Sequence, residues 1–392
     1  MSSKIKSVVF IIGLLFILPN LISQNQAREV SNHSITAFYV FGDSYVDPGN
    51  NNYIGSIAKS NFAPYGIDFV NQKATGRFSD GKVIADFLAS YLGFENYVPY
   101  LDPDFTIQAK PAVGFASAGT GFDNRTAAVL NVIPMSMQLE YFKEYKAKLA
   151  STIGQEEADN QTTSAVFIVN CAVNDFAINY YGLGNVVGHP DGTTIEQYEE
   201  FVLQLLQEFV QGLVELGARR IAVSGVPLFG CWPNVITLYS SDPVNPLVTR
   251  NCNETLNSVG SDYNAKVQEA LNTMQSSLAN QGLKVAYFDT YTPMLNILQN
   301  PANYGKLQNP GTQVLTSSIS YFLFVCLFVG FDVINKGCCG TGLLEQAVLC
   351  NPHSAICSDR SKYEFFDSVH LTEAASSVIA GANIAAINYI TN

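Results

Sequence analysis

Five short apolar segments rich in Val, Ile and Phe recur along the chain, and each is typical of a strand buried on both faces. Segments with helical periodicity alternate with them, which predicts a parallel sheet between two layers of helices. We therefore expect an α/β fold, a three-layer α/β/α sandwich with a five-stranded parallel sheet. The five predicted strands are Ile35–Phe41, Ala112–Phe115, Ala165–Asn170, Arg220–Val223 and Lys284–Phe288.

The clearest helical pattern runs over Ile195–Leu216 and ends at Gly217, which suits a helix C-cap. No internal repeat and no low-complexity linker stands out in the sequence, so we expect one domain over residues 28–392. Its apolar stripe comprises Tyr198, Phe201, Val202, Leu205, Leu206, Phe209, Leu213 and Leu216. The other predicted helices are Gly81–Tyr91, Pro134–Ala150, Ser258–Asn280 and Thr372–Tyr389.

The first residues are typical of a secretory signal peptide. Lys4 and Lys6 precede an apolar run over Val8–Leu18 that is too short to cross a bilayer. We expect cleavage between residues 23 and 27, so that segment 1–27 is removed and the mature protein is extracellular. An uncleaved anchor is the alternative.

Charge narrows the range of partners. The formal net charge is −12 and no cluster of Lys and Arg stands out, so nucleic acids and anionic membrane surfaces are disfavoured. Charged residues make up only 14% of the chain, which argues against long disordered tracts. We expect no nucleic-acid partner and no stable membrane anchor.

In a secreted protein, cysteines can form disulfides and N-x-S/T sequons can be glycosylated. Thiols in an oxidising compartment form disulfides, and a zinc site that combines the late cysteines with His353 is the competing interpretation. The eight cysteines are Cys171, Cys231, Cys252, Cys326, Cys338, Cys339, Cys350 and Cys357. The candidate glycosylation sites are Asn32, Asn124, Asn160 and Asn253.

Two short motifs carry groups suited to nucleophilic catalysis. Phe41-Gly42-Asp43-Ser44 follows the first predicted strand, at the sheet edge where open α/β folds form their sites. Asp367 and His370 are three residues apart, close enough to meet across one turn. A serine hydroxyl needs a base, and the base needs an orienting carboxylate, so we predict a Ser44–His370–Asp367 triad. The plainer interpretations are a helix-capping Ser44 and a structural His370.

Acyl transfer through a serine also needs hydrogen-bond donors for the oxyanion. Gly119 lies in a Gly-rich stretch after the second predicted strand, and Asn174 follows the third. We predict that these residues and the Ser44 N–H form an oxyanion hole, although each alone is an ordinary turn residue.

Two other patterns do not carry a function. Gly76–Val83 nearly matches a phosphate-binding loop, but Val83 replaces the required Ser or Thr and no strand precedes the segment. The G-x-S-x-G nucleophile elbow of α/β-hydrolases is absent from the chain.

From about residue 36 to the C-terminus, the chain resembles the plant GDSL esterase/lipase family, a branch of the SGNH hydrolases. The resemblance implies a flavodoxin-like α/β/α sandwich, the Ser-His-Asp triad named above, and an oxyanion hole from Ser44, Gly119 and Asn174. The matching segments are Phe41–Asn52 (FGDSYVDPGNNN), Ala74–Gly81 (ATGRFSDG), Gly337–Gly342 (GCCGTG) and Phe366–Glu373 (FDSVHLTE).

Four positions depart from the family pattern, and none removes a catalytic group. Tyr45 replaces Leu, Gly114 replaces Asn, and Leu371 replaces Pro. Ala172 replaces a Gly two residues before Asn174, and it shifts that loop if a positive φ is required there. We therefore expect these changes to affect the rate more than the mechanism.

We also expect three disulfides. One joins Cys231 to Cys252, and Cys171, at a buried strand end, stays a free thiol. The other two bridges form among Cys338, Cys339, Cys350 and Cys357.

One insertion departs strongly from the family. Residues 306–330 lie between Tyr304-Gly305 and Phe331, where relatives are continuous. Codons for 305–307 can contain a splice donor, and codons for 329–330 can contain an acceptor after a T-rich tract. We therefore hypothesise that the insertion is translated from an unspliced intron. An extra buried segment is the structural alternative, since the apolar run is too short for a membrane span.

The sequence as a whole predicts a secreted serine hydrolase that cleaves carboxylic esters through an acyl-enzyme, with no metal or organic cofactor. The expected partner is a small-molecule or lipid ester. An acyltransferase that uses the same triad, and a non-catalytic binding protein on this fold, are the alternatives.

Overall fold

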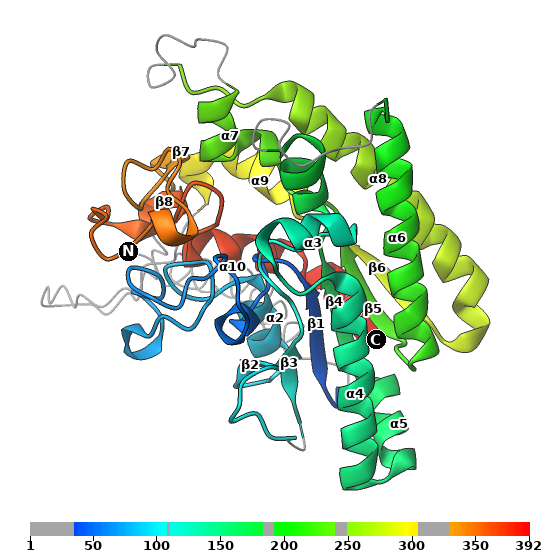
Figure 1. Cartoon of the computed structure of the whole chain (residues 1–392). Helices are drawn as coiled ribbons and strands as arrows, with labels where there is room; N and C mark the ends of the chain where they lie inside the picture. The colour runs from blue at the N-terminus through cyan, green and yellow to red at the C-terminus, as the bar shows by residue number, and fades with distance from the viewer. Residues whose placement is uncertain (1–34, 108–109, 183–191, 240–248, 305–329) are drawn as a thin grey trace, which may run out of the picture. The chain divides into compact units, whose positions relative to one another are not determined.

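The apolar segments of the chain pair into a six-stranded parallel sheet (Figure 1). This computed structural model describes residues 35–107, 110–182, 192–239, 249–304 and 330–392. The sheet order is β2-β3-β1-β4-β5-β6. The strands are β1 Phe38–Gly42, β2 Tyr97–Pro99, β3 Ala112–Gly114, β4 Val166–Asn170, β5 Arg220–Ser224 and β6 Lys284–Phe288.

The predicted α/β sandwich is confirmed, but its sheet has one strand more than the five that we predicted. All five predicted strands are present, with ends that differ by up to three residues. The additional strand, β2, lies at the edge of the sheet, pairs only with β3, and has three residues that end in Pro99. Such a short run that contains proline has no strand signature of its own.

The strand order places a topological switch point beside β1. The chain moves from β1 outward to β2 and β3 on one side, and then crosses back to β4 on the other. In the register, Val40 lies opposite Gly114, and Gly42 lies opposite Asn170. The loops that follow β1, β3 and β4 therefore leave the same edge of the sheet, which is where ligands bind in open α/β folds.

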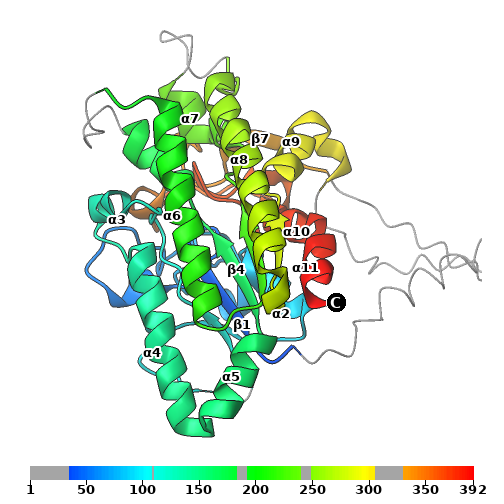
Figure 2. The ribbon, with the colours of Figure 1, turned by 90° about the vertical axis from the view of Figure 1, so that its right-hand side faces the viewer.

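Two sets of helices enclose this sheet, as Figures 1 and 2 show. On one face α4, α6 and α8 pack side by side, and on the other α2 packs against α10. The helices are α2 Ile84–Tyr91, α3 Asn124–Leu130, α4 Met135–Ile153, α5 Gln155–Ser164, α6 Ile195–Glu215, α7 Pro233–Leu238, α8 Glu254–Leu278, α9 Tyr291–Gln299, α10 Glu373–Ala382 and α11 Ile384–Thr391.

Burial follows the predicted pattern with few exceptions. Every residue of β1 and β4 is buried, because both strands are central and covered on both faces. In α6 most of the predicted stripe faces the core, but Phe201 is 40% exposed at its edge. The long C-terminal helix that we predicted is divided at Asn383, whose amide instead hydrogen-bonds the main chain of Asp289.

A small second sheet lies outside the main one. Strands β7 (Val333–Gly337) and β8 (Tyr363–Phe365) pair in parallel, and β8 leads directly into the segment that holds Asp367 and His370. Within the described residues, Ile35–Ile390 form one compact unit. In the same part of the chain no single helix is long and apolar enough to cross a membrane, and only α10 and α11, bent by 48° at their junction, meet the criterion when joined.

Candidate active site

Ser44 lies on a tight turn directly after β1. Gly42 has a φ of +133°, and a side chain there would collide with the Asn170 carbonyl oxygen of β4. The Gln138 side chain fixes this turn, because it accepts a hydrogen bond from the Gly42 N–H at 2.9 Å and donates one to the Gly42 carbonyl at 3.0 Å. The Ser44 side chain is therefore held at the carboxyl edge of the sheet.

The structure brings Ser44, His370 and Asp367 together. His370 Nε2 lies 2.9 Å from Ser44 Oγ, and His370 Nδ1 lies 2.7 Å from Asp367 Oδ2. A carboxylate only accepts hydrogen bonds, so Nδ1 carries the proton and Nε2 is free to accept the serine proton. All three side chains are buried, Asp367 completely. This is the geometry of a nucleophile, a general base and an orienting acid.

The three-residue spacing of Asp367 and His370 has a local cause. Asp367 Oδ1 accepts hydrogen bonds from the main-chain N–H groups of Val369 at 2.8 Å and His370 at 2.7 Å. This Asx-type turn folds the segment back so that the imidazole returns to the carboxylate of the same turn. The helix that we predicted to begin at Thr372 starts immediately afterwards, with the Thr372 side chain as its N-cap.

The segment that we set aside as a false phosphate loop packs against His370. The Phe78 ring lies 4.6 Å from the His370 ring, centroid to centroid. Its neighbour Arg77 is buried and makes a two-pronged ion pair with Asp86, with both N–O distances at 2.8 Å, and it also donates to the Pro48 carbonyl. These contacts were not predicted, although Ala74–Gly81 is one of the segments that match the family.

The two predicted oxyanion residues flank a common backbone group. The Asn174 amide donates to the Thr120 carbonyl at 2.9 Å, and Gly119, the residue before Thr120, has a φ of +88°. Gly119 lies in the loop after β3, and Asn174 lies in the loop after β4. Both strands pair with β1, so the two loops border Ser44 at the edge of the sheet. A glycine suits this position because a positive φ strains other residues.

A buried carboxyl that the sequence analysis overlooked organises the Gly-rich loop. Asp175 follows Asn174 and accepts hydrogen bonds from the N–H groups of Phe122 at 2.7 Å and Asp123 at 3.0 Å, and from the Thr126 hydroxyl at 2.6 Å. It therefore ties the loop after β3 to the loop after β4. No sequence signal distinguishes it from any other acidic turn residue.

The conditional expectation about Ala172 is resolved. Ala172 adopts a φ of +98°, the conformation that glycine accommodates without strain. Its carbonyl accepts a hydrogen bond from the Asp175 N–H at 3.0 Å, which keeps the turn that presents Asn174. The turn is formed, and the alanine makes it strained.

Three carboxyls in the segments that follow β1 and β4, those of Asp43, Asp47 and Asp175, are buried. Burial raises the pKa of Asp43 to about 7, and the neighbouring charge of Asp175 adds to this effect. Burial likewise raises the pKa of Asp175 to about 7 and that of Asp47 to about 6. Asp43 Oδ2 has no hydrogen-bond partner, so this carboxyl is favoured in its neutral form.

Tyr45, one of the departures from the family pattern, connects three elements. Its hydroxyl accepts a hydrogen bond from Trp232 Nε1 at 2.9 Å and donates to the Val369 carbonyl at 3.3 Å. The ring also meets the His370 ring edge to face at 6.3 Å. The tyrosine therefore braces the loop that carries the histidine in a way that leucine cannot.

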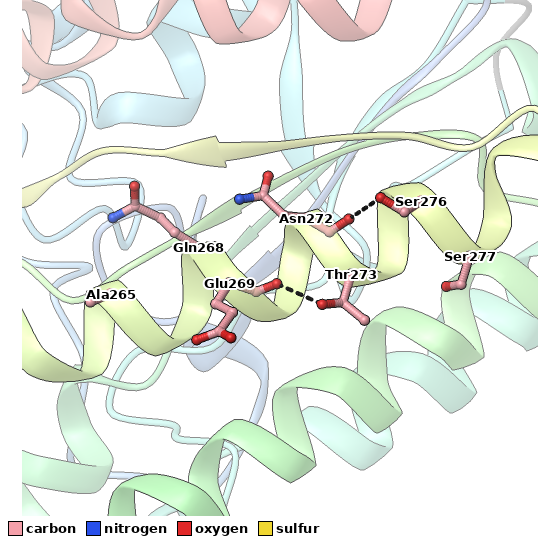
Figure 3. Close-up of a pocket in the computed structure, with 7 residues that line it drawn as sticks. All are labelled: Ala265, Gln268, Glu269, Asn272, Thr273, Ser276 and Ser277. Carbon is pink, nitrogen blue, oxygen red and sulfur yellow. Dashed lines mark hydrogen bonds between the residues drawn. The ribbon is translucent and has the colours of Figure 1, made fainter.

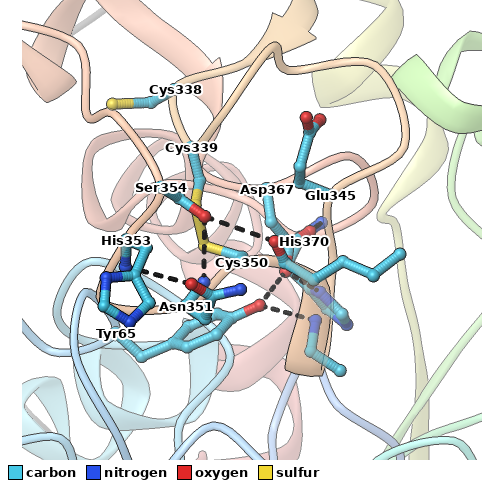
Figure 4. Close-up of a disulfide and its surroundings, with 12 residues drawn as sticks. Tyr65, Cys338, Cys339, Glu345, Cys350, Asn351, His353, Ser354, Asp367 and His370 are labelled. Carbon is cyan, nitrogen blue, oxygen red and sulfur yellow. Dashed lines mark hydrogen bonds and ion pairs between the residues drawn. A yellow bond between two sulfur atoms is a disulfide. The ribbon is translucent and has the colours of Figure 1, made fainter.

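The disulfide expectations are confirmed. Cys231 is bonded to Cys252, and Cys171 is a buried free thiol. The other two bridges are Cys338–Cys357 and Cys339–Cys350, so these cysteines do not form the zinc site weighed above. Figure 4 shows the Cys339–Cys350 bridge in the neighbourhood of Asp367 and His370. Cys326 lies outside the described residues.

A hollow along one face of α8 is lined mainly by polar side chains and includes no triad residue (Figure 3).

Three of the four candidate glycosylation sites lie within the described residues. Asn124 and Asn160 are exposed, and Asn253 caps α8 by accepting a hydrogen bond from the Leu256 N–H. Asn32, the segment 1–27 and all of the insertion except Gly330 lie outside the described residues. In the described chain no group of three or more His, Cys, Asp and Glu residues is arranged to hold a metal ion.

The sequence is similar to those of known proteins of one family. The model of the GDSL-like lipase/acylhydrolase family matches residues 38–382. One GDSL esterase/lipase of Arabidopsis thaliana is 43% identical over 343 residues, which cover 87% of this chain and 83% of the relative. A second from the same plant is 38% identical over 95% of this chain and 94% of its own length, and a third is 37% identical over 88% and 89%.

Proposed function

We propose that this chain, which belongs to the GDSL-like lipase/acylhydrolase family, cleaves its ester substrates through a Ser44–His370–Asp367 triad and an acyl-enzyme. Membership of this family makes the protein a carboxylic-ester hydrolase. The observation that carries the mechanism is the unbroken chain of two hydrogen bonds, 2.9 Å from Ser44 to His370 and 2.7 Å from His370 to Asp367.

In the first half of the reaction Ser44 Oγ attacks the ester carbonyl carbon while His370 Nε2 takes the hydroxyl proton. The Asp367 carboxylate stabilises the imidazolium and keeps its ring oriented. The tetrahedral intermediate collapses when the carbon–oxygen bond to the alcohol breaks and His370 returns the proton to the departing oxygen. The products are the free alcohol and an acyl ester on Ser44.

In the second half of the reaction, water hydrolyses the acyl-enzyme. His370 removes a proton from water, the hydroxide oxygen bonds to the acyl carbon, and collapse of the second intermediate returns the proton to Ser44 Oγ. In both intermediates the negative oxygen accepts hydrogen bonds from the main-chain N–H groups of Ser44 and Gly119 and from the Asn174 amide. These donors are built into rigid turns, so little reorganisation is needed in the transition state.

The test replaces the nucleophile and one unrelated serine. Ser44→Ala is expected to lower kcat for a p-nitrophenyl ester by several orders of magnitude with an unchanged melting temperature. Ser90→Ala, an exposed serine on α2, is the matched control and should retain full activity. Near wild-type kcat in the Ser44 variant would sink the assignment. Assays with added glycerol measure how much acyl group passes to an alcohol in place of water.

We also propose that the protein is secreted and glycosylated. Three disulfides support folding in an oxidising compartment. The exposed side chains of Asn124 and Asn160 support glycan attachment at these two sequons. N-terminal sequencing and glycan-site mapping of protein from the culture medium of expressing plant cells test both points. An intact N-terminus on a cell-bound protein contradicts secretion.

A further inference from the structure

We propose that Tyr65 is a positioning residue of the triad, whose hydroxyl holds the Asp367 carboxylate in the orientation that His370 requires. The proposal rests on the function proposed above. Tyr65 lies 302 positions from Asp367 in the chain, yet its hydroxyl donates to Asp367 Oδ2 at 2.7 Å. This is the same oxygen that accepts from His370 Nδ1.

Asp367 is fully buried, so every hydrogen bond to its carboxylate matters. Oδ1 is held by two main-chain N–H groups of its own turn, those of Val369 and His370. Oδ2 accepts from His370 Nδ1 and from the Tyr65 hydroxyl. Among the described residues, Tyr65 therefore supplies the donor from a distant part of the chain, and it fixes the oxygen that faces the catalytic base.

A second hydrogen bond determines where the hydroxyl proton points. The main-chain N–H of Ala347 donates to the Tyr65 oxygen at 2.8 Å. An N–H group can only donate, so the tyrosine proton must be directed toward Asp367. Burial raises the pKa of Tyr65 well above its usual value, and the charge of Asp367 raises it further, so the phenol keeps this proton.

Rigid surroundings hold the ring of Tyr65. The side chain is 1% exposed and makes edge-to-face contacts with Phe78 at 5.6 Å and Phe366 at 5.4 Å between centroids. Ala347 lies in the loop closed by the Cys339–Cys350 disulfide, and Figure 4 shows the Tyr65 hydroxyl directed toward Asp367. The position of Asp367 is thus coupled to a covalently closed loop.

The consequence concerns the chemical step. His370 becomes positively charged as Ser44 attacks. Asp367 Oδ2 must then keep its hydrogen bond with His370 Nδ1 to stabilise that charge. Without the phenol, Asp367 Oδ2 loses its hydrogen-bond donor from outside the turn, and we expect the carboxylate to rotate more easily. A phenylalanine fills the same apolar cavity, so packing alone does not explain a hydroxyl at this position.

The experiment compares Tyr65→Phe with Tyr91→Phe. Tyr91 is a partly buried tyrosine on α2 whose hydroxyl donates to Asn388 Oδ1 at 2.7 Å, so the control removes the same group away from the triad. We expect Tyr65→Phe to lower kcat for a p-nitrophenyl ester roughly ten- to a hundredfold with KM unchanged, as loss of a hydrogen bond to a charged group does. The low-field proton resonance of His370 Nδ1–H should be displaced in this variant alone.

Unchanged kcat and an unchanged resonance in Tyr65→Phe overturn the proposal, as does an effect confined to KM. If the variant does not fold, 3-fluorotyrosine at position 65 keeps the ring and the donor but changes its acidity. A displaced resonance then supports the contact, and an unmoved one contradicts it. The resonance also separates this proposal from the proposed function, because it reports on Asp367 and His370 even if Ser44→Ala stays active.

Discussion

The main-chain N–H of Phe331 donates a hydrogen bond to the main-chain carbonyl of Tyr304 at 3.0 Å. These two residues are the last described residue before the insertion at 306–330 and the first residue after it. A second bond, from the Phe331 N–H to the Pro301 carbonyl at 2.9 Å, holds the same junction. The described chain segments on the two sides of residues 305–329 are therefore hydrogen-bonded to each other.

Deleting 306–330 should yield an active and more soluble enzyme. The shortened chain reads Tyr304-Gly305-Phe331, and the existing N–H to carbonyl bond then spans three residues, as in a γ-turn. Removing an apolar Phe-rich run also removes a site of aggregation. Soluble yield, light scattering and kcat of the two forms measure the effect, and a loss of kcat in the shortened form would show that the insertion is needed.

The proposed origin of the insertion is tested on nucleic acid. If it is a retained intron, mature transcripts that lack these codons exist, and the genomic junctions carry GT and AG. Transcripts that always contain the codons, or junctions without these dinucleotides, exclude the hypothesis.

Asn174→Ala is expected to reduce kcat by about a hundredfold, because one donor of the proposed oxyanion hole is lost. The side chain also donates to the Thr120 carbonyl, so a modest fall in melting temperature accompanies the change. Asn272→Ala on the polar face of α8 is the control and leaves both quantities unchanged. A loss seen only in KM assigns Asn174 to substrate binding.

Tyr45→Phe should destabilise the fold by about 1–3 kcal/mol, because the buried Trp232 N–H loses its acceptor. Adding Trp232→Phe removes that orphaned donor, so the double variant should be less destabilised than the sum of the two single variants. Urea denaturation of all four proteins gives the coupling energy. Strict additivity would mean that this hydrogen bond contributes nothing measurable.

Ala172→Gly should stabilise the protein by roughly 0.5–1 kcal/mol, because a φ of +98° strains alanine more than glycine. kcat should stay within about twofold of the wild type, since the turn that presents Asn174 is already formed. Ala158→Gly in the interior of α5 is the opposite control and should destabilise. If both substitutions change the free energy of unfolding in the same direction, as measured by denaturation, Ala172 is not strained.

The buried carboxyls predict that the protein is more stable in mild acid. Burial raises the pKa of Asp43 and Asp175 from an ordinary value of 3.8 to about 7, so the folded state binds these protons more tightly than the unfolded state. This stabilisation is complete below about pH 4 and is lost as the pH rises through 7. We expect the melting temperature to fall by on the order of 5 °C from pH 5 to pH 8.

Asp43→Asn isolates one of these groups. The amide oxygen can still accept from the Tyr45 N–H, which Asp43 Oδ1 does at 3.1 Å, while the titration disappears. The pH dependence of melting should therefore become shallower, whereas Asp262→Asn on the exposed surface of α8 should leave it unchanged. Identical slopes in all three proteins would show that Asp43 does not titrate in this range.

Features that depend on neighbouring residues along the chain were predicted well. The five predicted strands and the stripe of α6 follow from local hydrophobic periodicity, because each element must bury one face or two. The edge strand that ends in Pro99 and the break of the C-terminal helix at Asn383 were missed. Both depend on partners elsewhere, β3 in one case and Asp289 in the other.

The sequence by itself determined which chemical groups are present, and its motifs predicted the Ser44–His370–Asp367 triad that we propose. Only the tertiary structure decided what surrounds them. The hydrogen bond from Tyr65 to Asp367 and that from Trp232 to Tyr45 join residues 302 and 187 positions apart. Local periodicity reports whether a side chain is buried, but it carries no information about which distant group it meets, because that choice is made by the packing of the whole sheet and its helices.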